Sequence, residues 1–126
     1  MDENQLSQII VDAAIEVHRT LGGPGLLESV YRGALALELR GRGLSVESKK
    51  LVPVQYKGQT IGTPLRLDLL VDKLVIVECK AVIEYNPIFE SQILTYLRLT
   101  VLKLGLVVNF GQRLVKQGIH RVVNGL

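Results

Sequence analysis

Cysteine, tryptophan and long apolar runs are scarce or missing in this sequence, and each shortage excludes a class of protein. The single cysteine, Cys79, rules out an internal disulfide and favours a reducing compartment. The chain has no tryptophan, four tyrosines and two phenylalanines, which disfavours a platform that stacks on single-stranded nucleic acid. No apolar run approaches the roughly 18 residues of a membrane span, and residues 1–5 are too polar for a signal peptide. We therefore expect a cytoplasmic protein without a membrane partner.

Several familiar site motifs are missing as well. The chain has no glycine-rich phosphate loop, no Cys and His cluster with metal-ligand spacing, and no internal repeat. Its composition, 48% hydrophobic and 21% charged, is that of a globular protein. We expect residues 1–126 to form a single domain, because this length buries most of the apolar surface of one core. The net charge of +3 is compatible with a polyanionic partner without requiring one.

Residues 65–81 are the most informative stretch. They are mostly branched and apolar, which predicts two adjacent β-strands in a core. Three charged residues, Asp68, Glu78 and Lys80, interrupt this pattern. An unpaired buried charge is costly, so each needs a partner, a metal or a cleft open to solvent.

The turn between these strands decides whether the charges meet. A two-residue turn would place Asp68 opposite Val77, on the wrong face, whereas a three-residue turn at residues 72–74 places it opposite Glu78. We favour the longer turn because it leaves one face wholly apolar. That face carries Leu67, Leu69, Val75, Val77 and Cys79. The other carries Arg66, Asp68, Leu70, Ile76, Glu78 and Lys80.

Two neighbouring carboxylates with a lysine predict metal-dependent chemistry. A divalent cation relieves the repulsion between the acids, and carboxylate oxygens are ligands that Mg²⁺ and Mn²⁺ prefer. A lysine beside them can orient a water or stabilise charge on a phosphate. The alternative is a surface hairpin with scattered charges, since so short a pattern arises often by chance. The residues alone leave both interpretations open.

The remaining elements follow from periodicity and breakers. Helical stripes occupy residues 6–21 and about 26–40, separated by the breaker at residues 22–25, and strand patterns follow from residue 44 to a turn at residues 57–59. A helix begins after Asn86 and Pro87 and runs to about residue 102, before strands at residues 104–110 and 119–123. Pro53 predicts a bulge or an edge position, and His18 is expected at the surface or at a helix end.

Two pairs of polar residues on the predicted helices are candidates for a site. Glu28 and Tyr31 share a face of the second helix, although an acid in a first turn is explained by the helix dipole alone. Gln92 and Tyr96 share a face of the third helix.

The order of helix, strands, hairpin with Asp and then Glu-x-Lys, helix and strand resembles the core of the PD-(D/E)xK nuclease superfamily. The resemblance implies an α/β (α+β) fold with a restriction-endonuclease-like core, in which helices flank a mixed central β-sheet. Leu67 replaces the proline of the name, at a position that varies in the superfamily.

A second resemblance is more specific. Residues 25–31, G-L-L-E-S-V-Y, are similar to the motif of the small bacterial GxxExxY proteins, which are grouped with this fold. Further stretches resemble that family, among them A-A-I-E-V-H-R-T-L-G, R-L-D-L-L-V, I-V-E-C-K-A, Q-I-L-T-Y-L and V-V-N-G-L.

The resemblance implies a role for individual residues. The implied catalytic residues are Asp68, Glu78, Lys80, Gln92 and Tyr96. The implied ligands of Mg²⁺ or Mn²⁺ are Glu28, Asp68, Glu78 and the backbone carbonyl of Cys79. The resemblance gives Tyr31 no chemical role, so packing is the expectation.

Three functions are therefore open at this point. The resemblance favours a metal-dependent nuclease that hydrolyses phosphodiester bonds of DNA or RNA. The alternative is a non-catalytic nucleic-acid-binding module that keeps the fold, because so short a chain has little surface beyond the core to grip a duplex. A homodimer or another protein could supply more surface to grip the duplex. In the third, the protein has a small-molecule or structural role, and the charges merely keep a cleft hydrated.

Overall fold

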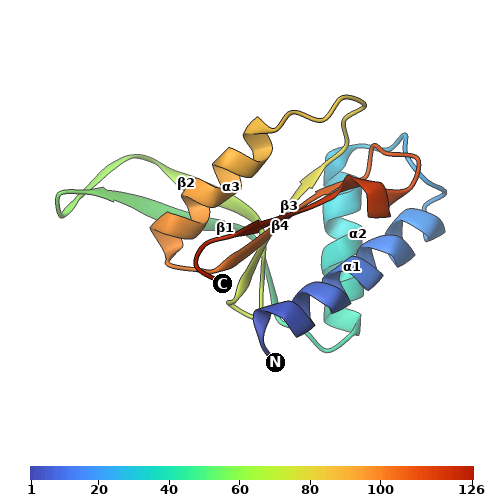
Figure 1. The fold of residues 1–126 in the computed structure, drawn as a ribbon, viewed down its shortest axis with the longest axis horizontal. Coiled ribbons are helices and arrows are strands. Elements are labelled where there is room, and N and C mark those ends of the chain that lie inside the picture. Colours follow the sequence, from blue (N-terminus) through green and yellow to red (C-terminus); the bar gives the residue numbers. More distant parts are fainter.

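The computed structural model describes residues 1–126 as three helices and a five-stranded sheet. The helices are α1 (Glu3–Thr20), α2 (Glu28–Gly41) and α3 (Ile88–Thr100). The strands are β1 (Val46–Tyr56), β2 (Gln59–Val71), β3 (Val75–Lys80), β4 (Leu104–Asn109) and β5 (Ile119–Val123), with a short 3₁₀ turn, η1 (Val115–Gly118), before β5. Helices α1 and α2 cover one face of the sheet and α3 covers the other (Figure 1).

The sheet is mixed, as predicted. Its strands lie in the order β1-β2-β3-β4-β5, and only β3 and β4 run parallel. Parallel neighbours need a crossover connection, which α3 provides. The fold is therefore an α+β fold of the predicted kind. No helix is long and apolar enough to cross a membrane.

Apolar side chains form a core on each face of the sheet. The larger core joins α1 and α2 to the sheet and includes Leu6, Ile10, Leu35, Leu39, Val77, Leu106 and Phe110. The smaller core lies under α3 and consists of Leu67, Ile76, Ile93, Leu97, Val107 and Val122. Gly105 lets α3 approach closely, because a Cβ atom there would lie 2.5 Å from the side chain of Ile93.

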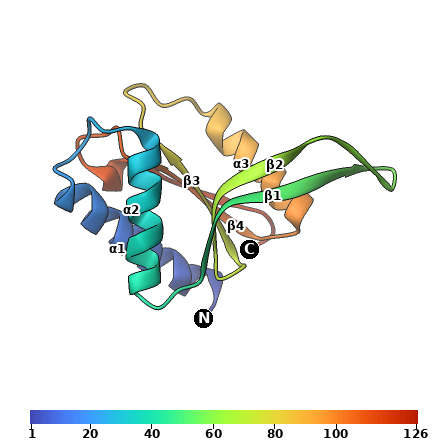
Figure 2. The same ribbon diagram turned by 180° about the vertical axis from the view of Figure 1, so that it is seen from behind.

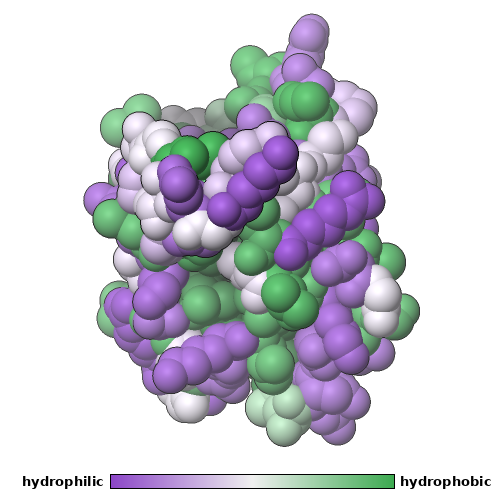
Figure 3. All heavy atoms as spheres, turned by 90° about the vertical axis from the view of Figure 1, so that its left-hand side faces the viewer, coloured by the Kyte–Doolittle hydropathy of each residue, from purple (hydrophilic) through white to green (hydrophobic).

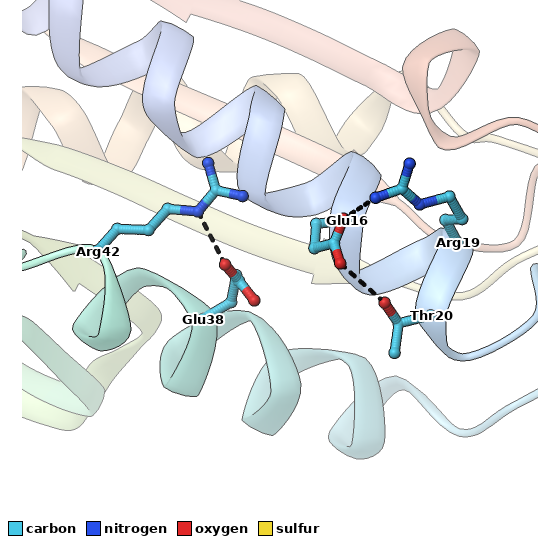
Figure 4. A network of polar contacts seen from close by, with 5 residues as sticks. All are labelled: Glu16, Arg19, Thr20, Glu38 and Arg42. Carbon is cyan, nitrogen blue, oxygen red and sulfur yellow. Dashed lines mark hydrogen bonds and ion pairs between the residues drawn. The ribbon is translucent and has the colours of Figure 1, made fainter.

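The outer faces of α1 and α2 carry exposed ion pairs. Glu16 accepts from Arg19 and from the hydroxyl of Thr20, and Arg42 donates to Glu38 at 2.8 Å (Figure 4). Such exposed pairs within one helix contribute little to stability. We give this network no functional role.

Strands β1 and β2 continue beyond the body of the molecule as a two-stranded arm, defined here as residues 49–66 (Figures 1 and 2). The arm turns at Lys57 and Gly58, whose positive φ angles of 49° and 80° suit a two-residue hairpin turn. β1 is an edge strand, which confirms one of the two positions expected for Pro53. The register also shifts between Val52 and Val54, where Pro53 alone stands opposite residues 62–64, so the extra residues of this irregularity belong to β2.

His18 lies in the last turn of α1, which confirms the helix end as the alternative that holds. It is not at the surface, because only 6% of its surface is exposed and Nε2 lies 3.2 Å from the carbonyl oxygen of Phe110. The third helix ends at Thr100 instead of residue 102, because Val101 adopts a left-handed conformation with φ 59°.

The predicted face of Leu67 is also wrong. Its side chain packs under α3, away from Leu69 and the core of α1 and α2. The alternation breaks at Asp68, which does not pair with the facing residue, Lys49, and Lys49 has a φ angle of 53°. The pairing resumes on both sides of this interruption, so the kink is local.

Candidate active site

The hairpin between β2 and β3 has the predicted three-residue turn. Leu69 pairs with Val77 and Val71 pairs with Val75, and the same register places Asp68 opposite Glu78. The turn residues Asp72 and Lys73 both have positive φ angles, 50° and 57°. The backbone N–H of Asp68 donates to Oε1 of Glu78 at 3.4 Å. The structure thus brings the two predicted carboxylates together.

Asp68 is held in place by the neighbouring backbone. Its Oδ2 accepts a hydrogen bond from the amide of Cys79 at 2.9 Å, and its Oδ1 lies 3.9 Å from Nη2 of Arg66. Only 4% of its surface is exposed. The Asp68 carboxylate therefore accepts a hydrogen bond from a backbone N–H of β3 at the place where the ordinary pairing of β2 and β3 ends. This bond fixes the orientation of one carboxylate oxygen.

Glu78 is held as a neutral acid. It is buried, with 9% of its surface exposed. Burial, followed by the negative charge and hydrogen bonding of Asp68, raises the pKa of Glu78 to about 8. In the absence of a cation, Glu78 keeps its proton at neutral pH.

Lys80 lies two residues further along β3 and is half-buried. Its Nζ lies 4.5 Å from the centre of the Phe89 ring, and none of the structure's ion pairs includes it. Its positive charge lowers the pKa of Glu78 in part, against the larger effects of burial and Asp68. The ammonium is thus held close to the acids by an aromatic face of α3, without being neutralised by them.

The two candidates on α3 differ in their surroundings. Tyr96 is half-buried, and burial together with the charges of Glu78 and Asp68 raises the pKa of its hydroxyl. Gln92 lies one turn earlier, is exposed and makes no side-chain hydrogen bond. The structure therefore brings Tyr96 into the electrostatic range of the carboxylates and leaves Gln92 facing solvent.

Glu28 begins α2 and is half-buried. Burial raises the pKa of the Cys79 thiol, and the charges of Asp68, Glu78 and Glu28 raise it further, so Glu28 lies within electrostatic range of the strand that bears the site. No group of three or more His, Cys, Asp or Glu side chains is placed to hold a metal ion. The side-chain ligands that the structure assembles are thus the pair of Asp68 and Glu78.

Tyr31 has a structural role that the sequence did not specify. It is fully buried, and its ring stacks on Phe110 with centroids 4.7 Å apart. Its hydroxyl donates to the carbonyl of Gly23 at 2.7 Å and accepts from the amide of Leu26 at 3.2 Å. Tyr31 therefore fixes the glycine-rich loop that leads to Glu28.

Asn109 is a further residue that sequence reasoning missed. It pairs in register with Lys80 at the end of β4 and is fully buried. Its Oδ1 accepts from the amides of Val82 and Gly111, and its Nδ2 donates to the carbonyl of Val82, each at 3.0 Å. A buried amide in the run L-G-L-V-V-N-F was the available signal. Asn109 anchors the segment that follows Lys80.

Phe89 was missed because it acts through a contact across elements, with Nζ of Lys80 on β3, and its residue type does not distinguish it from an ordinary helix aromatic. Arg66 lies two residues before Asp68 on β2, so strand spacing placed it on the face of the site, but residue type alone gave it no role there.

The chemistry of the carboxylate pair fits a divalent cation. Asp68, Glu78 and the backbone carbonyl of Cys79 offer only oxygen atoms, and Mg²⁺ usually binds through one or two carboxylates while keeping several waters. Burial and the charge of Asp68 raise the pKa of Glu78, so a positive charge beside the pair would favour the ionised carboxylate. A cation that displaces the proton of Glu78 would supply it, so the residues present suit Mg²⁺ or Mn²⁺.

Comparison with known proteins agrees with this geometry. No curated protein and no solved structure matches the chain significantly. A family model described as the PD-(D/E)XK nuclease superfamily matches residues 4–122, which includes all three helices and nearly the whole sheet. The chain belongs to the PD-(D/E)XK nuclease superfamily.

Proposed function

We propose that this protein is a nuclease that hydrolyses phosphodiester bonds with the help of Mg²⁺ or Mn²⁺. The observation that carries the proposal is the placement of two buried acids opposite each other, with the backbone N–H of Asp68 donating to Oε1 of Glu78 and with Lys80 two residues further along the same strand as Glu78. Membership of the superfamily supports a nucleic-acid substrate.

In this proposal Asp68, Glu78 and the carbonyl of Cys79 hold the ion. When bound, the ion supplies a Lewis acid for the phosphate and lowers the pKa of a water. Asp68 is already oriented by its hydrogen bond from the amide of Cys79, so it needs no rearrangement to bind. Glu28 adds negative charge at the α2 side of the site.

The remaining site residues act on the substrate. Lys80 orients the attacking water and stabilises the charge that develops on the phosphate oxygens. Tyr96 keeps its proton well above neutral pH, so its hydroxyl is a donor to a phosphate oxygen. Gln92 is exposed on the same helix and contacts the nucleic acid beside the bond that is cut.

We also propose membership of the GxxExxY proteins within the superfamily. The support is the segment from Gly25 to Tyr31 with Glu28 inside it. The hydrogen bonds of Tyr31 to the preceding loop give the tyrosine of this motif a physical reason, because they hold the loop that precedes α2.

The test is cleavage of labelled single- and double-stranded DNA and RNA in Mn²⁺, in Mg²⁺ and in EDTA. Wild-type protein is compared with Lys80→Ala and with Lys73→Ala, an exposed lysine in the turn of the same hairpin. We expect cutting by the wild type and Lys73→Ala, and loss of cutting in EDTA and in Lys80→Ala. Equal cutting by Lys80→Ala, or no cutting of any substrate, would reject the nuclease and favour a non-catalytic binding module.

A further inference from the structure

The arm has an unusual distribution of charge. Between Glu47 and Asp68 the chain has no acidic residue. The cations of this segment are Lys49, Lys50, Lys57 and Arg66. Lys50 makes an exposed ion pair with Glu47 at 3.4 Å, a kind of pair that contributes little. The arm therefore presents positive charge at its root, from Lys49, Lys50 and Arg66, and at its tip, from Lys57.

The arm is largely open to solvent. Figure 3 views the molecule from the end toward which the arm points and shows hydrophilic side chains mixed with apolar ones on this face. Tyr56, at the tip, is 59% exposed, and Leu51 and Ile61 are exposed too. Val52, at the root of the arm, packs against the smaller core, whereas the rest of the ribbon presents exposed apolar and basic side chains beyond the body of the protein.

The arm begins at the candidate active site. It is the direct continuation of β2, the strand that carries Asp68, and Arg66 at its root lies 3.9 Å from that carboxylate. The seven steps along the strand from Lys50 to Lys57 span about 23 Å at roughly 3.3 Å per residue. This corresponds to about seven base pairs at roughly 3.4 Å each. A nucleic acid bound at the site would therefore meet positive charge at the root and at the tip of the arm.

A second copy of the chain is a poor occupant for this surface. The outer edge of β1 carries Lys49, Lys50 and Pro53, and lysine and proline on an edge oppose the addition of another strand. Pro53 has no backbone N–H to donate, and the pairing of β1 with β2 shifts register beside it, so this edge is not a regular template for another strand. In a two-fold symmetric pair of arms, each copy would bring the same excess of positive charge to the contact, and this repulsion opposes association.

We propose that the arm binds duplex DNA by lying in the major groove, with its lysines on the flanking phosphates. The proposal rests on the proposed nuclease function and assigns its substrate class. The major groove of B-form DNA admits a two-stranded β-ribbon, whereas the major groove of A-form RNA is too narrow. Tyr56 and Ile61 supply apolar contacts to the base edges.

Binding is measured in EDTA, where the proposed chemistry is off, with a labelled DNA duplex of about 20 base pairs between 50 and 200 mM salt. The arm variant is Lys49→Gln/Lys50→Gln/Lys57→Gln. The matched control, Lys103→Gln/Arg113→Gln/Lys116→Gln, removes the same charge from exposed side chains outside the arm. Thermal melts establish that both variants fold.

We expect the arm variant to bind at least about tenfold more weakly at 100 mM salt. Its plot of log affinity against log salt should be shallower by about 2.7, at roughly 0.9 per lost phosphate contact. The control should keep nearly the wild-type slope. An RNA duplex of the same sequence should bind more weakly and lose less in the arm variant.

Three results would overturn the proposal: an unchanged salt slope in the arm variant, an equal loss of affinity in the control, or an RNA duplex whose binding depends equally on the arm.

Cleavage in Mn²⁺ tests the nuclease separately from the arm. If the protein cuts nucleic acid but its binding does not depend on the arm, only the proposed role of the arm is rejected. Binding through the arm without cutting of any substrate supports the arm and rejects the nuclease, and a wild type that binds no nucleic acid rejects both.

Discussion

The amide of Cys79 donates to Oδ2 of Asp68 at 2.9 Å, so a backbone group of one strand orients an acidic side chain of the next. This bond occurs where the two strands stop pairing in the ordinary way, beyond Leu69 and Val77. The same interruption turns Leu67 toward α3. One local departure from a regular ladder therefore sets the orientation of the first proposed metal ligand.

The bond between Cys79 and Asp68 can be tested by two substitutions that both remove the charge. Asp68→Ala leaves the buried amide of Cys79 without an acceptor, which costs about 1–3 kcal/mol, whereas Asp68→Asn keeps an acceptor oxygen. We expect Asp68→Ala to be less stable than Asp68→Asn by that amount in denaturant unfolding. Both should lose cleavage. Equal stabilities would mean that the hydrogen bond does not hold this strand end.

The raised pKa of Glu78 predicts an unusual dependence of folding stability on pH. Its pKa is about 8 in the folded protein and near 4.5 when unfolded, so between these values the folded state binds more protons. The free energy of unfolding of the metal-free protein should therefore fall, by a few kcal/mol in total, as pH rises from about 4.5 to about 8.

Glu78→Gln and Glu78→Ala should remove this contribution to the pH dependence, because neither side chain titrates. At pH 8 both should be at least as stable as the wild type, since the repulsion between Glu78 and Asp68 is gone. Chemical unfolding at several pH values in EDTA measures this. A wild-type profile no steeper than that of Glu78→Gln, or a clear loss of stability in Glu78→Ala at pH 8, would show that Glu78 is structural.

Phe89 should matter for catalysis through Lys80. The ammonium lies 4.5 Å from the ring centre, and such a contact contributes about 0.5–2 kcal/mol. We expect Phe89→Leu to lower kcat of DNA cleavage by about 2- to 30-fold, with Phe89→Tyr close to wild type because it keeps an aromatic face. An unchanged kcat in Phe89→Leu would exclude a role in positioning Lys80.

Gly111 should tolerate no side chain. A Cβ atom there would lie 2.3 Å from the carbonyl oxygen of Val82, in the segment that Asn109 anchors. Gly111→Ala should therefore destabilise the fold by several kcal/mol, in the range of overpacked sites. The control is Gly33→Ala in α2, where no atom lies within 4 Å and alanine should stabilise the helix by about 1 kcal/mol. Similar melting temperatures for the two variants would contradict the close packing.

Much of the fold could be predicted from local patterns of residues in the sequence. Apolar periodicity and breakers predicted each helix and strand in order, and the apolar face of the hairpin selected the register that brings Asp68 to Glu78. The burial of His18 could not be predicted, because it depends on Phe110, which is distant in sequence.

The candidate site was predictable only where its residues share a strand or a helix face. Asp68, Glu78 and Lys80 have a spacing that strand geometry interprets, and Tyr96 came from the resemblance to the superfamily. Asn109 and Phe89 depend on contacts between distant elements, which no spacing rule encodes. At Asp68 the side chain, in place of a backbone group, is the hydrogen-bond partner of the Cys79 amide, and β2 is kinked there. A prediction from strict alternation along the strand therefore placed Leu67 on the wrong face.

The central claim is that Asp68 and Glu78 form a metal centre, and calorimetric titration with Mn²⁺ tests it most directly. The wild type should bind Mn²⁺ more tightly at pH 8 than at pH 6 and release a proton at pH 6, because the ion must displace the proton of Glu78. Glu78→Gln should bind far more weakly and release none. Equal binding by both proteins at both pH values would contradict the claim.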